Sequence, residues 1–263
     1  MSILSVQKAT TRYEQNLVFQ DLDLDIKKGV VTSIIGPNGC GKSTLLKTIG
    51  RILKPKSGKI YLQDQELTTI PTKKIAKHLA LLPQNPIAPS ELNVEELISY
   101  GRYPHLKNIN KLTSEDKDII EWSMEITHTL SFRDRQLHNL SGGQRQKVWL
   151  AMALAQKTEI ILLDEPTTFL DLAHQLEVLQ IIERLNADFH CTIVMVLHDI
   201  NHAARFSHEI VAMKKGSIVA KGTPAQLITT EILEQVFQIR ARVMTDPHNG
   251  SPVCYGYEST LPV

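Results

Sequence analysis

The sequence predicts an α/β protein that combines an N-terminal antiparallel β subdomain, a parallel-sheet core and an inserted helical segment. Two half-exposed strands come first, because apolar and polar residues alternate in "ILSVQKATTRY" and "LVFQDLDLDI", with "YEQN" as the turn between them. Three later segments are continuous apolar runs rich in β-branched residues: Val30 to Ile35, Glu159 to Asp164 and Cys191 to His198. Such runs are typical of parallel strands that are covered on both faces.

Helical patterns fill much of the rest. Leu172, Leu176, Leu179 and Ile182 recur every three to four residues between the last two apolar runs, so a helix with one apolar face connects these two strands. Only helical patterns occur between residues 86 and 157: "NVEELISY", a capped helix from "TSED" through "IIEWSMEITHTL", and a helix that Ser141 caps with Gln144 as capping-box partner. A hairpin, "EIVAMKKGSIVAKG", turns at Lys215 and Gly216, and "TPAQLITTEILEQVF" closes the pattern.

We therefore expect one domain over residues 1–263. Its parallel-sheet core with the β subdomain would span residues 1–85 and 158–228, the helical insertion residues 86–157, and a C-terminal extension residues 229–263.

Composition excludes several classes of function. The 29 basic and 28 acidic residues leave a formal net charge of +1, which gives no electrostatic reason to expect a nucleic-acid partner. Three cysteines without CxxC spacing suggest neither a disulfide framework nor a zinc site, and a reducing compartment fits them best. The longest apolar run, Val148 to Ala155, has eight residues, and the start lacks the pattern of a signal peptide. We expect a chain that neither crosses a membrane nor is exported by itself.

The stretch "GPNGCGKST" satisfies the phosphate-loop pattern GxxxxGK[ST] between a predicted strand and a predicted helix. Its glycines let backbone N–H groups converge on phosphate oxygens, Lys42 would reach the β and γ phosphates, and Ser43 would hold Mg²⁺. Cys40 is either a reactive or ligating thiol or a small residue that fills the loop. The predicted nucleotide-binding residues of this loop are Gly36, Pro37, Asn38, Gly39, Cys40, Gly41, Lys42, Ser43 and Thr44.

A second motif, "IILLDEP", places Asp164 and Glu165 at the carboxyl end of a predicted strand. Ligands bind at that end of a parallel sheet. Asp164 would reach the metal directly or through water, and Glu165 would accept a proton from the water that attacks the γ-phosphate. The alternative is a strand that simply ends in a polar turn before Pro166.

These two motifs would also suit kinases and GTPases, and the stretch "LSGGQRQ", Leu140 to Gln146, distinguishes among these classes. With it, the sequence resembles the ABC ATPases, a branch of the P-loop NTPases, over its whole length. The resemblance implies that Tyr13 stacks on adenine, that Gln84 meets Mg²⁺ or the attacking water, and that His198 donates to the γ-phosphate. Tyr13 as a core or turn tyrosine and Gln84 as an ordinary loop residue remain the alternatives. His198 and His202 have metal-ligand spacing, but His198 precedes the helix expected near Ile200, which argues against a zinc pair.

The resemblance also implies partners. Ser141, Gly142, Gly143 and Gln144 of one copy would close over the γ-phosphate held by Lys42 of a second copy, packed head to tail, and two ATP molecules with Mg²⁺ would lie at that interface. Asp171 would be an interface residue and also cap the following helix. As a transport motor the chain would dock on integral-membrane permease subunits at the cytoplasmic face of the cell membrane, as a peripheral subunit, and serve an extracytoplasmic substrate-binding protein indirectly.

Four stretches, "SYGRYPH", "TTFLDLAHQ", "LHDINHAARF" and "VMTDPHNGSPV", are similar to the ATPases of iron-siderophore importers, most of all the ferric hydroxamate type. This likeness implies the ATPase motor of a bacterial importer for ferric siderophores, with haem, cobalamin or another metal complex as alternative cargo. A soluble ABC ATPase that acts on DNA, ribosomes or iron-sulfur assembly is less favoured, because the chain has neither a long coiled coil nor a second cassette.

Overall fold

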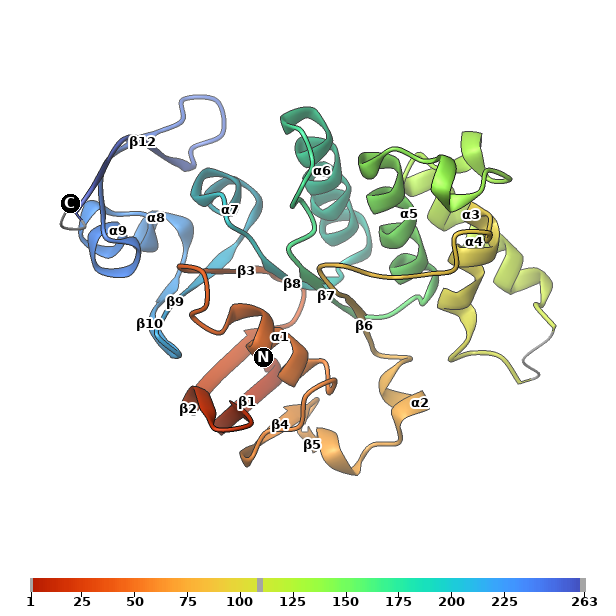
Figure 1. Ribbon diagram of the computed structural model, residues 1–263, viewed down its shortest axis with the longest axis horizontal. Coiled ribbons are helices and arrows are strands. Elements are labelled where there is room, and N and C mark those ends of the chain that lie inside the picture. The colour runs from red at the N-terminus through yellow and green to blue at the C-terminus, as the bar shows by residue number, and fades with distance from the viewer. Residues whose placement is uncertain (1, 108–110, 261–263) are drawn as a thin grey trace. The chain divides into compact units, whose positions relative to one another are not determined.

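The computed structural model describes residues 2–107 and 111–260, and contacts within the chain divide it into two compact units (Figure 1). Unit 1 combines residues 1–69 with residues 192–263, and unit 2 comprises residues 70–191. Among the described residues, no helix is both long enough and apolar enough to cross a membrane. The segment boundaries expected above, such as 86–157 for the helical insertion, stay predictions.

Unit 1 contains the predicted antiparallel β structure as a four-stranded sheet in the order β2-β1-β4-β5. Leu4 lies opposite Ile26 of β2 on one side and Leu62 of β4 on the other, and all three side chains are buried. Polar residues alternate with these apolar ones, so one face of the sheet is apolar, as the alternating pattern predicts. The four strands are β1 (Ser2–Tyr13), β2 (Asn16–Lys27), β4 (Ser57–Leu62) and β5 (Gln65–Glu66), and the short 3-10 helix η1 (Leu67–Thr69) follows them.

Unit 1 also holds parallel strands. β3 (Val31–Ile35) lies between β8 (Thr192–Val196) and β9 (Glu209–Lys214) and pairs parallel with both. Every residue of β3 and β8 is buried, which confirms the prediction from their apolar runs. β10 (Ser217–Gly222) pairs antiparallel with β9, and the turn at Lys215 and Gly216 has positive φ at both residues, so the predicted hairpin is confirmed.

The helices of unit 1 and the end of the chain follow from these strands. α1 (Lys42–Ile49) comes after β3, α7 (Ile200–Phe206) comes after β8, and α8 (Pro224–Leu227) and α9 (Thr230–Phe237) come after the hairpin. A second hairpin of β11 (Ile239–Thr245) and β12 (Pro252–Ser259) was not predicted. The side chain of Asn201 connects this hairpin to α7, because it donates to the carbonyl of Cys254 at 3.1 Å and accepts from the amide of Cys254 at 2.7 Å.

Unit 2 contains the third predicted strand, β7 (Ile160–Asp164), which is buried throughout and pairs parallel with β6 (Leu79–Leu82). The predicted helix with one apolar face is α6 (Leu172–Phe189), and Asp171 caps it by accepting from the amide of His174 at 3.0 Å. A short helix, α2 (Thr72–Ile75), precedes β6.

The remaining elements in the described part of unit 2 are helical, apart from one antiparallel bridge between Asn93 and Gln136. They are α3 (Val94–Ser99), η2 (Tyr100–Arg102), α4 (Ser114–Ile126), η3 (Leu130–Phe132), η4 (Leu137–Asn139) and α5 (Gly142–Ala155). α3 and α4 pack against α5 (Figure 1). Asn93, Thr113 and Ser141 each cap a helix with a full capping box, so the predicted caps of α4 and α5 are confirmed.

A buried ion pair joins these helices. The Nε of Arg102 donates to Asp116 at 2.8 Å, and Nη1 of the same guanidinium donates to the carbonyl of Ala155, the last residue of α5, at 2.7 Å. Asp116 also accepts from the amide and the hydroxyl of Thr113 at 2.9 and 2.7 Å. One guanidinium therefore connects η2, the first turn of α4 and the end of α5.

Candidate functional site

The phosphate loop belongs to unit 1 and runs from the end of β3 into α1. Gly36 has φ +151°, and a Cβ at this position would lie 2.1 Å from the carbonyl oxygen of Met213. Gly41, which precedes the first residue of α1, has φ +106°. Because only glycine adopts these conformations at low cost, the two glycines let the backbone turn closely around a ligand.

Lys42 opens α1, as predicted, and its side chain is only 5% exposed. Its Nζ donates to the carbonyl of Gly36 at 2.8 Å and to that of Pro37 at 3.1 Å, so the ammonium group lies under the loop itself. Ser43 and Thr44 follow in the same first turn. A buried cation and the positive end of the helix dipole thus lie together, which is the arrangement that anionic phosphates require.

Cys40 lies within this loop and is buried. Burial raises the pKa of its thiol, although the nearby Lys42 acts in the opposite direction. The carbonyl of Cys40 accepts a hydrogen bond from the amide of Gly216 at 3.0 Å. A buried thiol with a raised pKa carries little thiolate, so the geometry favours the small loop-filling residue over a reactive or ligating one.

Two further predicted residues lie in unit 1. Tyr13 ends β1 and is 45% exposed, so part of this residue is open to solvent. His198 is exposed and lies two residues beyond β8. It precedes Asp199, which caps α7, so His198 and His202 do not share a helix. The described residues contain no cluster of three or more His, Cys, Asp or Glu that could hold a metal ion.

The acidic motif lies in unit 2 at the carboxyl end of β7. Asp164 ends the strand and is 1% exposed. Glu165 follows with φ +54°, a conformation that is unfavourable for a residue with a Cβ and is concentrated at functional sites. Its Oε2 accepts from the Nε2 of Gln84 at 2.5 Å and from the hydroxyl of Thr168 at 3.0 Å. The structure thus brings together Gln84 and Glu165, which lie far apart in the sequence.

The stretch "LSGGQRQ" also belongs to unit 2 and begins α5. Ser141 accepts from the amide of Gln144 at 3.2 Å, and the side chain of Gln144 accepts from the amide of Ser141 at 3.1 Å. Ser141 and Gly142 are exposed, whereas Gly143 is buried. The helix start is therefore held by its own side chains and presents its first residues to solvent.

The segment from the end of β7 into the first turn of α6 carries Asp171 and two side chains that the sequence did not single out, Phe169 and His174. Phe169 is 88% exposed and has φ +65°. His174 donates to Asp171 from its amide at 3.0 Å and approaches the same oxygen with Nδ1 at 2.7 Å. These two hydrogen bonds hold the pKa of Asp171 below its usual range. Thr168, the partner of Glu165, was also missed, and no signal in the sequence distinguishes it from its neighbour Thr167.

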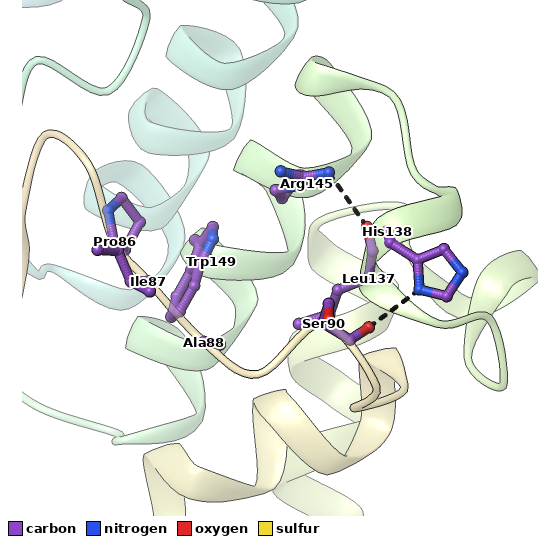
Figure 2. Close-up of a pocket in the computed structure, with 8 residues that line it drawn as sticks. All are labelled: Pro86, Ile87, Ala88, Ser90, Leu137, His138, Arg145 and Trp149. Atoms are coloured by element: carbon purple, nitrogen blue, oxygen red, sulfur yellow. Dashed lines mark hydrogen bonds between the residues drawn. The ribbon is translucent and has the colours of Figure 1, made fainter.

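A pocket of about 260 Å³ lies entirely within unit 2 (Figure 2). Figure 2 shows Trp149 of α5 beside Ile87 and Ala88, and Arg145 of the same helix next to Leu137, whose carbonyl accepts its hydrogen bond. Ile87 is 93% exposed. The lining residues are Pro86, Ile87, Ala88, Ser90, Leu137, His138, Arg145 and Trp149. The pocket thus joins the loop that holds Gln84 to the helix that begins with the exposed glycine of "LSGGQRQ".

Comparison with known proteins agrees with this geometry. A protein family described as ABC transporter matches residues 19–168. The chain is 52% identical over 258 residues to the iron(3+)-hydroxamate import ATP-binding protein FhuC of Bacillus subtilis (strain 168), covering 98% of this chain and 96% of that protein.

Two solved structures are similar to the structure of this chain. One is an ABC transporter assigned to the metal-chelate type, in an inward-facing conformation, with a TM-score of 0.83, 28% identity and coverage of 97% of this chain and 96% of the other. Another is the dimeric structure of MJ0796, a bacterial ABC transporter cassette, with a TM-score of 0.74, 28% identity and coverage of 84% of this chain and 98% of the other.

Proposed function

Because the chain belongs to the ABC transporter family, we propose that it is the ATP-hydrolysing subunit of a bacterial importer for ferric hydroxamates. The chain binds ATP and is an ATPase, as the ATP-binding subunits of this family are. The observation that carries the proposal is the likeness to the iron(3+)-hydroxamate import protein, which extends over nearly the whole of both chains. Haem, cobalamin or another metal complex is the alternative cargo.

We assign the nucleotide to the phosphate loop. Gly36 to Thr44 would hold the phosphates through backbone amides, with Lys42 on the β and γ phosphates and Tyr13 stacked on adenine. The buried ammonium group of Lys42 and the glycines with positive φ support this assignment. An aromatic face on a base contributes roughly 1 to 3 kcal/mol.

We assign Mg²⁺ to Ser43, Gln84 and Asp164. Hydroxyl, amide and carboxylate oxygens are the ligands that this ion prefers, so the donor set fits it. The ion would neutralise charge on the phosphates. Gln84 donates to Glu165 through Nε2, so its Oε1 is the amide atom that would meet the metal.

Glu165 is the proposed general base, and His198 would donate a hydrogen bond to the γ-phosphate. Gln84 and Thr168 both donate to Oε2 of Glu165, and these two bonds orient the carboxylate that would take the proton of the attacking water. Glu165→Gln is expected to abolish turnover while ATP binding persists, and Lys42→Ala to lose both. Equilibrium dialysis with labelled ATP and phosphate release would measure the two quantities, with Glu183→Gln on the exposed side of α6 as control. Equal loss of binding and turnover in Glu165→Gln would contradict the assigned base.

The second anion-binding helix start, at Ser141, is proposed to serve another molecule. Ser141, Gly142, Gly143 and Gln144 of one copy would close over the γ-phosphate held by Lys42 of its partner, with Asp171 at the same interface. The exposure of Ser141 and Gly142 supports this assignment, as does the dimeric state of the related cassette. Purified Glu165→Gln protein should self-associate when ATP is added, alone or with its permease. Sedimentation velocity that shows one unchanged species in both cases would refute the head-to-tail dimer.

The pocket lined by Ile87 and Trp149 is the proposed contact with the permease. The pocket is apolar on the side of Ile87, Ala88 and Trp149, and it adjoins the loop that holds Gln84. Because Gln84 is proposed to contact Mg²⁺, a permease helix in this pocket would contact a loop whose position depends on the bound nucleotide. Ile87→Asp is expected to weaken co-purification with the permease. Ile52→Asp is the control, because Ile52 is also exposed, at 63%, but lies in unit 1. Equal retention of the permease by both variants would contradict this contact.

The chain would act at the cytoplasmic face of the cell membrane as a peripheral subunit, with the extracytoplasmic substrate-binding protein as an indirect partner and no nucleic acid involved. The test is uptake of labelled ferric hydroxamate, haem and cobalamin by cells that carry the natural chain or Lys42→Ala. Lys47→Ala, in the same helix, is the control. Loss of ferric hydroxamate uptake alone is the expected result, and unchanged uptake of all three compounds would defeat the importer proposal.

A further inference from the structure

His174 lies in the first turn of α6 and contacts two segments that are separated in the sequence. One is the loop that ends at Asp171, and the other is the start of α5 at Gly143. Both segments belong to the surface proposed to meet the second copy. His174 itself is only partly exposed and is not among the groups assigned to ATP or Mg²⁺.

The imidazole ring lies directly against the backbone of Gly143. A Cβ built on this glycine would be 2.5 Å from Cδ2 and 2.8 Å from Cγ of His174, closer than any real contact allows. Gly143 has no positive φ that would call for glycine, so it is the ring that excludes a side chain here. A Cβ on the preceding Gly142 would meet nothing within 4 Å. The two adjacent glycines therefore differ, because a neighbouring side chain excludes a Cβ at Gly143 and none does so at Gly142.

The other edge of the ring holds Asp171. Nδ1 lies 2.7 Å from Oδ1, the same oxygen that accepts the helix-capping bond from the amide of His174 at 3.0 Å. An ionised carboxylate only accepts hydrogen bonds, so Nδ1 must carry the proton of this contact. The ring thereby fixes the rotamer of Asp171, which as a cap alone could rotate more freely.

A second contact follows one turn further along the same pair of helices. Lys147 of α5 donates to Glu177 of α6 at 2.8 Å, and the side chain of Lys147 is 11% exposed. Gly143 with His174 and Lys147 with Glu177 thus make two successive connections between the beginnings of α5 and α6. The start of α5 and the loop before α6 are held as one body rather than as two independent segments.

We propose that His174 is a positioning residue that sets Asp171 and the first turn of α5 in one fixed arrangement, ready to meet the ATP and the loop of a second copy. This inference rests on the proposed head-to-tail dimer. His174 acts through its neighbours and touches no reacting group. Its ring seats the helix start, and its Nδ1–H orients the aspartate.

Two substitutions separate these actions. His174→Phe keeps a ring against Gly143 but removes the donor, whereas His174→Asn keeps a donor close to the position of Nδ1 but removes the ring. In the Glu165→Gln background, the ATP concentration for half-maximal self-association is expected to rise about three- to ten-fold in His174→Phe, since one hydrogen bond of ordinary strength, to a carboxylate that is largely exposed, is lost. His174→Asn should stay nearer to the parent. The affinity of the single copy for ATP, measured by equilibrium dialysis, should not change in either variant.

The outcomes distinguish this inference from the function on which it rests. If the Glu165→Gln parent does not associate with ATP, the dimer itself fails. If the parent associates and His174→Phe associates at the same ATP concentration, the role of His174 is overturned. Equal impairment of both variants together with weaker ATP binding by the single copy would also overturn it, because that result would show a general structural role.

A stability measurement tests the contact independently of association. Gly143→Ala should lower the melting temperature in the natural chain and lower it much less in a His174→Asn background, where the ring is absent. Gly142→Ala is the matched control and should show no such dependence on residue 174. Equal effects of Gly143→Ala in the two backgrounds would contradict the ring contact.

Discussion

Replacement of Arg102 by alanine is expected to lower the free energy of unfolding of unit 2 by about 3 to 5 kcal/mol, the usual cost of breaking a buried ion pair. Arg102 is 4% exposed, and its guanidinium bonds Asp116 and the carbonyl of Ala155. Its loss would leave a buried carboxylate with only the hydrogen bonds from Thr113. For a chain of this length, the melting temperature should fall by roughly 6 to 20 °C.

The size of this effect should depend on pH in a defined direction. Burial acts to raise the pKa of Asp116, but hydrogen bonds from Thr113 and Arg102 outweigh it and hold that pKa below its usual range. The stabilisation is therefore complete above the pKa of an unfolded aspartate, about 3.9, and is lost as the pH falls through the lower pKa of the folded state. The difference between the natural chain and Arg102→Ala should be largest near neutral pH and shrink in acid.

Thermal unfolding followed by circular dichroism would measure this difference at several pH values. Lys59→Ala is the control, because it breaks an exposed ion pair with Glu66 and should leave the melting temperature unchanged within error. The double variant Arg102→Met with Asp116→Asn should recover much of the loss, since no buried charge is left unpaired. A melting temperature of Arg102→Ala equal to that of the natural chain at neutral pH would refute the reasoning.

Three further predictions concern packing, acid stability and thiol reactivity. Gly101→Ala should cost about 1 to 3 kcal/mol in thermal unfolding, because a Cβ there would lie 2.2 Å from a carbonyl oxygen of α5; an unchanged melting temperature would contradict this close approach. Although burial acts to raise the pKa of Glu209, ion pairs with Lys27 and Lys221 hold that pKa below its usual range. The natural chain should therefore lose stability as the pH falls through this pKa, and Glu209→Gln should lose less over the same pH range, as measured by urea unfolding. Burial raises the pKa of Cys254 to about 11, so a thiol reagent at pH 8 should modify it slowly until urea unfolds the chain, and rapid labelling of the folded chain would argue otherwise.

Features that depend on neighbours in the sequence could be predicted well. Helix caps such as Ser141 with Gln144 need only a few consecutive residues, and the turn at Lys215 and Gly216 is equally local. The buried parallel strands were predicted because their apolar runs are continuous. The bounds of β8 are shorter than the apolar run, since Leu197 and His198 lie beyond its last residue.

Features that depend on long-range pairing could not be predicted. The parallel pairing of β9 with β3 joins residues 177 positions apart, such as Thr32 and Glu209, and the sequence of β9 indicated only its hairpin with β10. The second hairpin is a different case: β11 alternates apolar and polar residues from Ile239 to Val243, a local sign of a strand that was missed, whereas its partner β12 is exposed over most of its length. In the candidate site, the bond from Gln84 to Glu165 and the contact of His174 with Gly143 arise only after folding, so motif spacing contained no sign of either.

The position of Trp149 in the wall of the pocket gives the molecule a built-in optical probe. The chain has two tryptophans, Trp122 and Trp149, and both lie in unit 2. Trp122 packs edge to face on Phe189 with ring centroids 5.2 Å apart, and the Nζ of Lys157 lies 3.8 Å from its ring centroid. Intrinsic fluorescence therefore reports on unit 2 without any label. A permease helix that entered the pocket would change the emission of Trp149 and leave that of Trp122 as an internal reference.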